Sequence, residues 1–211
     1  MAARGNVPGA GEFVPEGAGI AELRAAAAGC RGCDLHRDAT QTVFGEGPAH
    51  AALLLVGEQP GDQEDRRGHP FVGPAGGLLD RALDEAGIDR GACYLTNAVK
   101  HFRFTERGKR RIHRQPGRTE IVACAPWLAA ELRAVRPRLV LCLGAIAAQA
   151  VLGTGFRVSE RRGELVELPG HAVLATVHPS AVLRAPDREE AYREFAADLG
   201  RARAALEALP R

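Results

Sequence analysis

The sequence predicts an α/β fold with three layers, α/β/α, in which helices cover both faces of a central, mostly parallel sheet. Three observations predict this class. Strand-like and helix-like segments alternate along most of the chain. The runs AALLLV (51–56) and LVLCL (139–143) are apolar at every position, which is typical of strands buried on both faces. A glycine follows each of these two runs, where a buried strand gives way to a turn.

The alternation assigns an element to each stretch of the chain. A short helix is expected over 20–28, ended by Gly29. The strongest helix is expected over 119–135, with Thr119 as its N-cap and Pro137 just past its end. The other elements are expected in this order: strand 51–56, helix 76–87, strand 92–99, strand 139–143, an Ala-rich helix ending at Leu152, a strand pair at 164–168 and 172–177, and a helix over 187–206 that Asp187 caps.

Length and composition bound the kind of protein. The 211 residues suffice for one well-filled α/β core, and 45% apolar residues is ordinary for a globular domain. Residues 1–18 are rich in Gly and Pro, so we expect a flexible leader there and a single domain over 19–211. No apolar run approaches the roughly 20 residues that cross a bilayer, and the leader lacks the apolar segment of a signal peptide. We therefore expect a cytoplasmic monomer with no membrane partner.

Positive charge is concentrated in one stretch. Residues 100–118, KHFRFTERGKRRIHRQPGR, hold eight basic residues and one acid, a local charge of +7 (8 − 1) with neutral histidines, whereas the whole chain carries +2. Lys and Arg gathered in this way neutralise phosphates and release counterions, which favours a polyanionic partner such as nucleic acid. A merely solvated surface loop is the alternative interpretation of the charge.

Polar residues gather at the places where the predicted strands end. G-E-Q-P-G-D follows the first strand at 57–62, Asn97 lies near the end of the second, and H-P-S follows the last at 178–180. In a parallel sheet the ligand lies just outside the carboxyl ends of the strands. The glycine spacing in 57–62 matches neither a P-loop nor a G-x-G-x-x-G fingerprint, which excludes those modes of mononucleotide and NAD binding. The sequence therefore predicts a different kind of ligand site at this edge.

Each of these residues has a chemical and a structural interpretation. Glu58 and Asp62 suit activation of water or stabilisation of positive charge, or they cap the next turn. Asn97 suits recognition of the two-group edge of a pyrimidine, or it bridges backbone. His178 suits donation to an oxygen that gains charge, or it is a satisfied structural histidine. Phe71, in a Gly-rich loop, is either a core residue or a stacking surface for a planar base.

The cysteines suggest a metal site. Five cysteines, an odd number, without a secretion signal argue against a disulfide framework. Cys30 and Cys33 form a C-x-x-C pair after a helix, and a metal site needs about two more ligands. The candidate ligands are Cys30, Cys33, His101 and Cys124, and ligand type alone does not separate zinc from iron–sulfur.

Together the motifs resemble the uracil-DNA glycosylase superfamily over roughly residues 28–206. The resemblance is closest to its iron–sulfur, family-4-like branch. Gln59 in place of the usual Ala, His101 in place of a cysteine, and the K-R-R-I-H loop ending at His113 are features of the UdgX subfamily. That subfamily bonds covalently to DNA after removing uracil. The matching motifs are C-x-x-C at 30–33, G-E-x-P-G at 57–61, G-x-P-F-V-G-x-A-G at 68–76, T-N at 96–97, Cys124, L-G-x-x-A at 143–147 and H-P-S at 178–180.

The resemblance implies an activity and a set of site residues. It implies uracil excision from DNA, with single-stranded DNA expected as the substrate, followed by attack of His113 on C1′ of the sugar. A turnover glycosylase with the same pocket, or a non-catalytic metalloprotein that binds nucleic acid, are the alternatives. The implied uracil pocket is Gly57, Glu58, Gln59, Phe71, Asn97, His178 and Ser180. The residues implied in catalysis are His113, Glu58, Gln59, Asp62 and His178. Lys109, Arg110 and Arg111 are implied as DNA contacts. The implied [4Fe-4S] ligands are Cys30, Cys33, His101 and Cys124.

Overall fold

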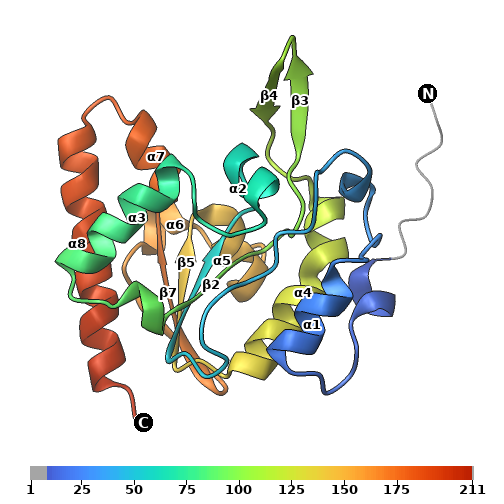
Figure 1. Ribbon diagram of the computed structural model, residues 1–211. Helices are drawn as coiled ribbons and strands as arrows, with labels where there is room; N and C mark the ends of the chain where they lie inside the picture. Colours follow the sequence, from blue (N-terminus) through green and yellow to red (C-terminus); the bar gives the residue numbers. More distant parts are fainter. Residues whose placement is uncertain (1–8, 211) are drawn as a thin grey trace.

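A five-stranded sheet lies at the centre of the structure, a computed structural model that describes residues 9–210 (Figure 1). Its strand order is β2-β1-β5-β7-β6. The first four strands are parallel, and β6 runs antiparallel to β7 at one edge. The strands are β1 (Leu53–Gly57), β2 (Tyr94–Asn97), β5 (Leu139–Leu143), β6 (Leu165–Leu168) and β7 (His171–Thr176).

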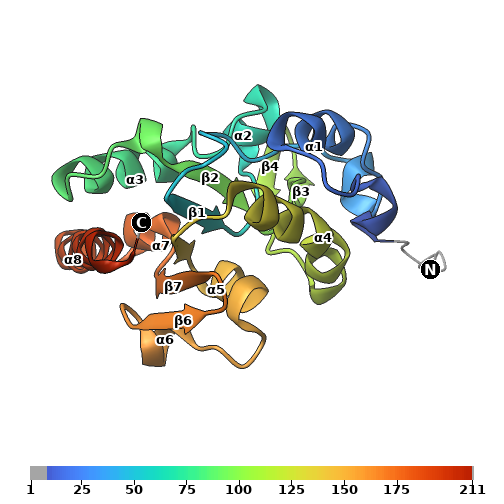
Figure 2. The ribbon, with the colours of Figure 1, turned by 90° about the horizontal axis from the view of Figure 1, so that it is seen from below.

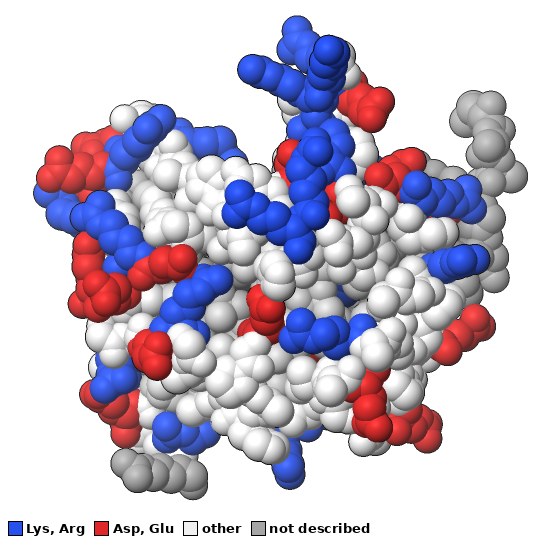
Figure 3. Space-filling view, in the orientation of Figure 1, with Lys and Arg blue, Asp and Glu red and all other residues white. Residues whose placement is uncertain are grey.

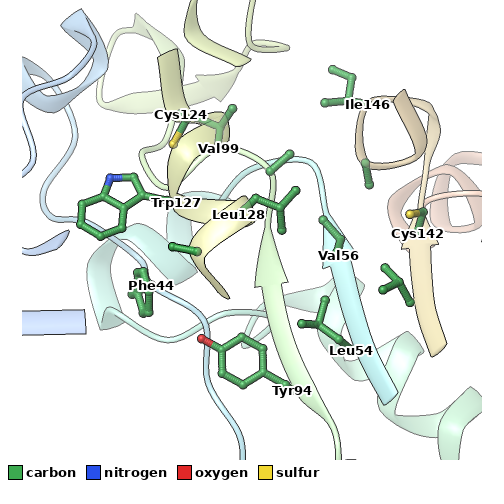
Figure 4. Packing of buried hydrophobic residues seen from close by; sticks show 14 of the residues in the cluster. Phe44, Leu54, Val56, Tyr94, Val99, Cys124, Trp127, Leu128, Cys142 and Ile146 are labelled. Carbon is green, nitrogen blue, oxygen red and sulfur yellow. The ribbon is translucent and has the colours of Figure 1, made fainter. Parts of the chain in front are cut away.

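Helices cover both faces of this sheet, so the predicted three-layer α/β/α fold is confirmed (Figure 2). One face carries α3 (Pro74–Glu85), α7 (Pro179–Arg184) and α8 (Arg188–Ala208), and the other carries α1 (Ile20–Ala27), α4 (Arg118–Val135) and α5 (Ala145–Leu152). Alternate residues of β1 supply the two cores. Leu53 and Leu55 share a core with α3 and α8, whereas Leu54 and Val56 share the other core with Leu128 of α4 (Figure 4).

Most predicted elements are found within a few residues of their expected bounds. The strand over 139–143 is as predicted, and Asp187 caps α8 by accepting a hydrogen bond from the Glu190 N–H at 2.9 Å. The predicted N-cap of α4 was wrong: Gly117 caps that helix, and Thr119 lies inside its first turn. Three short helices were not predicted: α2 (Asp62–Arg67), α6 (Val158–Arg161) and α7.

The basic stretch is a β-hairpin and not a loop. Strands β3 (Phe104–Arg107) and β4 (Arg110–His113) pair antiparallel, with Phe104 opposite His113. The turn consists of Gly108 and Lys109, and Gly108 has a φ of +60°, a left-handed conformation that glycine adopts without strain. The hairpin projects from the carboxyl end of the sheet (Figure 1).

The folded part begins earlier than the sequence predicted. Residues 9–18 were expected in the flexible leader, but a 3-10 turn over Ala10–Phe13 packs against α4, and Ala10 is buried. Gly9 N–H donates to the carbonyl of Gly32 at 3.1 Å. The close approach requires a glycine at position 32, because a Cβ there would lie 2.6 Å from Ala10 N. Residues 1–8 of the expected leader lie outside the described residues.

Two further 3-10 turns, Asp34–Arg37 and Arg90–Ala92, lie in the connections before β1 and β2. Across residues 9–210, none of the helices is both long and apolar enough to span a membrane.

Candidate active site at the carboxyl end of the sheet

A cavity of about 760 Å³ opens at the carboxyl ends of β1, β2 and β7. Its position is the one expected for a ligand site in a parallel sheet. The structure brings together in its wall nearly all the residues predicted for the pocket. These are Glu58, Gln59, Asp62, Phe71, Asn97, His113, His178 and Ser180.

The floor of the cavity is built around Gly57. Gly57 is paired with Asn97 in the sheet, and a Cβ at position 57 would lie 2.3 Å from Asn97 Oδ1 and 2.7 Å from Phe71 Cζ. Both neighbours are buried. Glycine at this position therefore lets a flat aromatic ring and a carboxamide meet in one corner of the cavity, an arrangement that suits a planar heterocycle.

Phe71 is held in a strained backbone conformation. Its φ is +56°, in the left-handed region that bulky residues avoid. The first turn of α3 packs directly on this residue, since a Cβ at Gly76 would lie 1.9 Å from the Phe71 carbonyl oxygen. The carboxylate of Glu64 fixes the start of the helix by accepting the Gly73 N–H at 2.8 Å. Strain of this kind, held by its surroundings, is typical of functional sites.

His178 is fixed as one tautomer. It is the N-cap of α7, and its Nδ1 accepts the Ser180 N–H at 3.1 Å and lies 2.8 Å from Ser180 Oγ. Because Nδ1 accepts, the ring proton is on Nε2. Burial, followed by the charges of His113 and Arg184, lowers the pKa of His178 to about 4. His178 is therefore a neutral N–H donor at the cavity wall at neutral pH.

Glu58 is half-buried, and its buried Oε1 atom has no hydrogen-bond partner among residues 9–210. Burial raises the pKa of its carboxyl, and Gln115 and Arg184 only partly offset this effect. Oε1 lies 3.6 Å from His113 Nε2. An unpaired oxygen of this kind can face a positive charge that develops in a ligand.

Gln59 joins the base of the hairpin to the cavity. Its Oε1 accepts the Arg103 N–H at 3.1 Å, and its Nε2 donates to the Arg114 carbonyl at 2.9 Å. The same Nε2 lies 2.9 Å from His113 Nε2 and 3.3 Å from the Arg103 carbonyl. The backbone contacts fix the orientation of the amide, so His113 Nε2 accepts and its proton is on Nδ1. Burial, and then the charge of Arg184, lowers the pKa of His113.

Asp62 and Arg111 are ion-paired to each other. Arg111 Nε donates to Asp62 Oδ1 at 2.5 Å, and Arg66 Nε donates to Asp62 Oδ2 at 2.9 Å. Burial alone would raise the pKa of Asp62, but the hydrogen bonds from Arg66 and Arg111 lower it. These contacts do not support the predicted roles of Asp62 as a catalytic group and of Arg111 as a DNA contact. Lys109 and Arg110 are exposed on the projecting hairpin, where Figure 3 shows basic side chains gathered.

A buried ion pair lies behind Asn97. Lys100 Nζ donates to the Asn97 carbonyl and to Thr96 Oγ1, both at 2.7 Å, and to Glu131 Oε2 at 2.5 Å. Tyr94 Oη and Thr96 Oγ1 donate to Glu131 Oε1, both at 2.9 Å. All three protons of the ammonium group are satisfied, so this network ties the carboxyl end of β2 to α4.

Three of the predicted metal ligands lie in the same hydrophobic core. Cys30, Cys33 and Cys124 are buried free thiols in the core that includes residues of α1 and α4. Figure 4 shows Cys124 one turn from Trp127 on α4. Trp127 Nε1 donates to Cys30 Sγ at 3.2 Å, and Lys100 N donates to Cys124 Sγ at 3.3 Å. Burial raises the pKa of Cys124 to about 12. Within the described part of the chain, no three metal-ligating side chains are grouped closely enough to hold a single metal ion.

His101 is also buried, and its tautomer is fixed. Thr42 Oγ1 donates its only proton to the Ala27 carbonyl at 2.9 Å, so it accepts from His101 Nε2 at 3.0 Å. Nδ1 therefore keeps a free lone pair, as a metal ligand requires. Burial, and then the charge of His36, lowers the pKa of His101 to about 4.

Several residues in the cavity wall escaped the sequence analysis. Glu64, Gln115, Leu183 and Arg184 line the cavity. Arg184 ends α7, and its charge lowers the pKa values of Glu58 and His113. The sequence held one signal for Arg184, its position six residues after the histidine of H-P-S. A short helix that starts at this motif places its last residue near the same edge of the sheet.

Comparisons with known proteins agree with this site. The family model of the uracil DNA glycosylase superfamily matches residues 44–200. A Type-4 uracil-DNA glycosylase of Pyrobaculum aerophilum is 37% identical over 165 residues, covering 74% of this chain and 81% of the relative. The Type-4 enzyme of Archaeoglobus fulgidus is 36% identical over 77% of this chain and 82% of its own length. That of Thermotoga maritima is 37% identical over 74% and 78%. These relatives support the family-4 branch, and the chain belongs to the uracil DNA glycosylase superfamily.

Proposed function

We propose that this protein excises uracil from DNA and then bonds to the abasic sugar through His113, as the UdgX resemblance implies. The observation that supports this most directly is the position of His113 Nε2. It lies in the cavity wall, 2.9 Å from Gln59 Nε2 and 3.6 Å from Glu58 Oε1. A neutral imidazole at that place is a competent nucleophile for a sugar carbon bound in the cavity.

Recognition of the base follows from the cavity floor. The uracil nucleotide leaves the DNA stack at a cost of a few kcal/mol and enters the cavity. Phe71 stacks on the ring, and the carboxamide of Asn97 pairs with N3–H and O4. Cytosine presents the reversed donor and acceptor, which would leave the buried amide unpaired, and sites built in this way discriminate strongly.

Cleavage of the glycosidic bond separates charge. The electron pair of the N1–C1′ bond leaves with uracil, and the sugar becomes an oxocarbenium-like cation. His178 donates its Nε2–H to the uracil oxygen that gains charge. The unpaired Oε1 of Glu58 faces the sugar, where a carboxylate stabilises the cation that develops during cleavage.

His113 then captures the sugar. The Nε2 lone pair forms a bond to C1′, and the resulting cationic ring loses its Nδ1 proton to solvent. The product is an N-alkylated imidazole, which has no good leaving group, so each molecule acts once. Gln59 can release His113 without cost, because its two amide protons have two other acceptors, the carbonyls of Arg103 and Arg114.

DNA binding and the cofactor complete the proposal. Lys109 and Arg110, exposed on the hairpin, supply phosphate contacts to single-stranded DNA. Cys30, Cys33, Cys124 and His101 would hold a [4Fe-4S] cluster. Three of them are buried thiols of the same hydrophobic core, and His101 has a free Nδ1. A cluster held by these residues would supply iron–ligand bonds to the segment before β1 and to α4.

The test separates excision from capture. The protein is incubated with a single-stranded oligonucleotide containing one uracil and is then boiled in SDS. We expect a shifted protein–DNA band, and we expect His113→Ser to lose the band while still releasing uracil. Free abasic product with multiple turnovers would show a conventional glycosylase. Absence of uracil release, with DNA binding that does not depend on Asn97, would show a non-catalytic binding protein.

A further inference from the structure

We propose that Arg111 is a positioning residue, which locks the hairpin over the cavity and thereby sets the place of His113 Nε2. This inference rests on the proposed function of His113 and adds a residue to it. The contacts of Arg111 with Asp62, Asp65 and Thr40 are called the Arg111 clasp below.

All three guanidinium nitrogens of Arg111 donate hydrogen bonds in the clasp. Nε donates to Asp62 Oδ1 at 2.5 Å, and Nη2 donates to the Asp62 carbonyl at 3.3 Å. Nη1 donates to Asp65 Oδ2 at 2.6 Å and to Thr40 Oγ1 at 3.1 Å. The side chain of Arg111 is only 12% exposed, so these partners, and not solvent, satisfy it. Only a planar group with several fixed donors can make these contacts together.

The acceptor side of the clasp is itself rigid. Asp65 is completely buried in α2, and both of its carboxylate oxygens accept the Thr40 N–H, at 3.0 and 3.1 Å. A buried carboxylate requires a counter-charge, and Arg111 is the ion-pair partner of Asp65 within residues 9–210. The charge of Arg111 is therefore committed to the protein and is not available to a DNA phosphate.

Aromatic packing connects the position of Arg111 to that of His113. The guanidinium carbon lies 5.4 Å from the centre of the Phe102 ring and 5.0 Å from that of Phe104. These two rings stack at 5.1 Å, and the His113 ring lies 6.0 Å from Phe102. Arg111 and His113 are two residues apart on β4, so both side chains face the same side of the hairpin.

The hairpin needs such an anchor. An isolated two-stranded hairpin is marginally stable in water. Gln59 holds its base through Arg103 and Arg114, whereas Arg111 lies midway along β4, between that base and the tip. Without the clasp, the hairpin keeps its base contact but loses the contact that fixes its tilt toward α2. A displacement of about 1 Å at a reacting atom typically costs about 10²-fold in rate.

The experiment compares two rates in the same protein. Full-length Arg111→Lys keeps the charge and loses the fork, and Arg111→Gln loses both. Arg107→Gln, on the exposed end of the same hairpin, is the charge-matched control. With uracil-containing single-stranded DNA under single-turnover conditions, the release of uracil and the appearance of the SDS-stable band are timed separately. Hydrogen exchange of the β4 amides is measured without DNA.

We expect both Arg111 variants to form the band at least about tenfold more slowly, with uracil release within about threefold of the parent. The β4 amides should exchange faster in both variants. Arg107→Gln should leave the ratio of the two rates and the exchange unchanged. Unchanged exchange and an unchanged ratio in the Arg111 variants would overturn the inference, as would an equal loss of both rates. If the parent protein itself forms no band, the proposed function fails instead, and the exchange result still decides whether the clasp holds the hairpin.

Discussion

Replacement of Gly57 by alanine should remove uracil excision while leaving the protein folded. The added methyl group would lie 2.3 Å from Asn97 Oδ1, and ordinary van der Waals contact begins at 3.4 Å, so the amide must retreat by about 1 Å. Phe71 Cζ, at 2.7 Å, must also move. Overpacking of this size costs about 1–3 kcal/mol of stability. A shift of about 1 Å at a recognition group costs about 10²-fold in rate.

The assay is single-turnover uracil release from a single-stranded oligonucleotide, with urea unfolding of the same preparations. Gly77→Ala is the matched control, because a Cβ at position 77, inside α3, meets nothing within 4 Å. It should keep the parent rate and gain about 0.5–1 kcal/mol, since alanine favours a helix over glycine. If Gly57→Ala released uracil at the parent rate, the floor of the cavity would not be the base-binding corner, and the reasoning would be refuted.

Three further outcomes are expected. Glu131→Gln leaves the buried charge of Lys100 uncompensated, and urea unfolding should show a loss of about 3–5 kcal/mol. Because burial lowers the pKa of His178 to about 4, the unfolded chain binds a proton between about pH 6.5 and 4 that the folded chain does not. The free energy of unfolding should therefore decrease as the pH is lowered from about 6.5 to 4, and it should decrease less steeply in His178→Asn. Cys124→Ser should lose bound iron and visible absorbance, whereas Cys142→Ala, a core thiol in β5, should keep both.

The sequence was a good guide to the central layers and to the floor of the site. Strands β1 and β5 are apolar throughout because both of their faces are covered, and that pattern is visible without coordinates. The convergence of Glu58, Asn97 and His178 followed from the same assignment, because parallel strands end at one edge. The order of residues along the chain was therefore enough to predict the buried strands and the edge at which these three residues meet.

Features that depend on distant partners were less predictable. Arg111 has the same local surroundings as Arg110 in the sequence, and only the folded chain shows that two acids of α2 take up its charge. The hairpin had a local signal, Gly108 at a two-residue turn, but the density of charge suggested a loop. Thr119 was a reasonable N-cap by residue type, yet the N-cap of α4 is Gly117, two residues earlier.

The 3-10 turn over Ala10–Phe13 has a practical consequence for handling the protein. It lies against the C-x-x-C segment through the contact between Gly9 and Gly32 and shares a core with both of its thiols. In a chain trimmed to start at residue 19, the boundary that composition suggests, this turn would be lost from the core, and we expect the thiols of Cys30 and Cys33 to become more exposed to dissolved oxygen. Purification of such a shortened chain in air should yield oxidised, aggregating material, whereas chains that retain residues 9–18 should tolerate it.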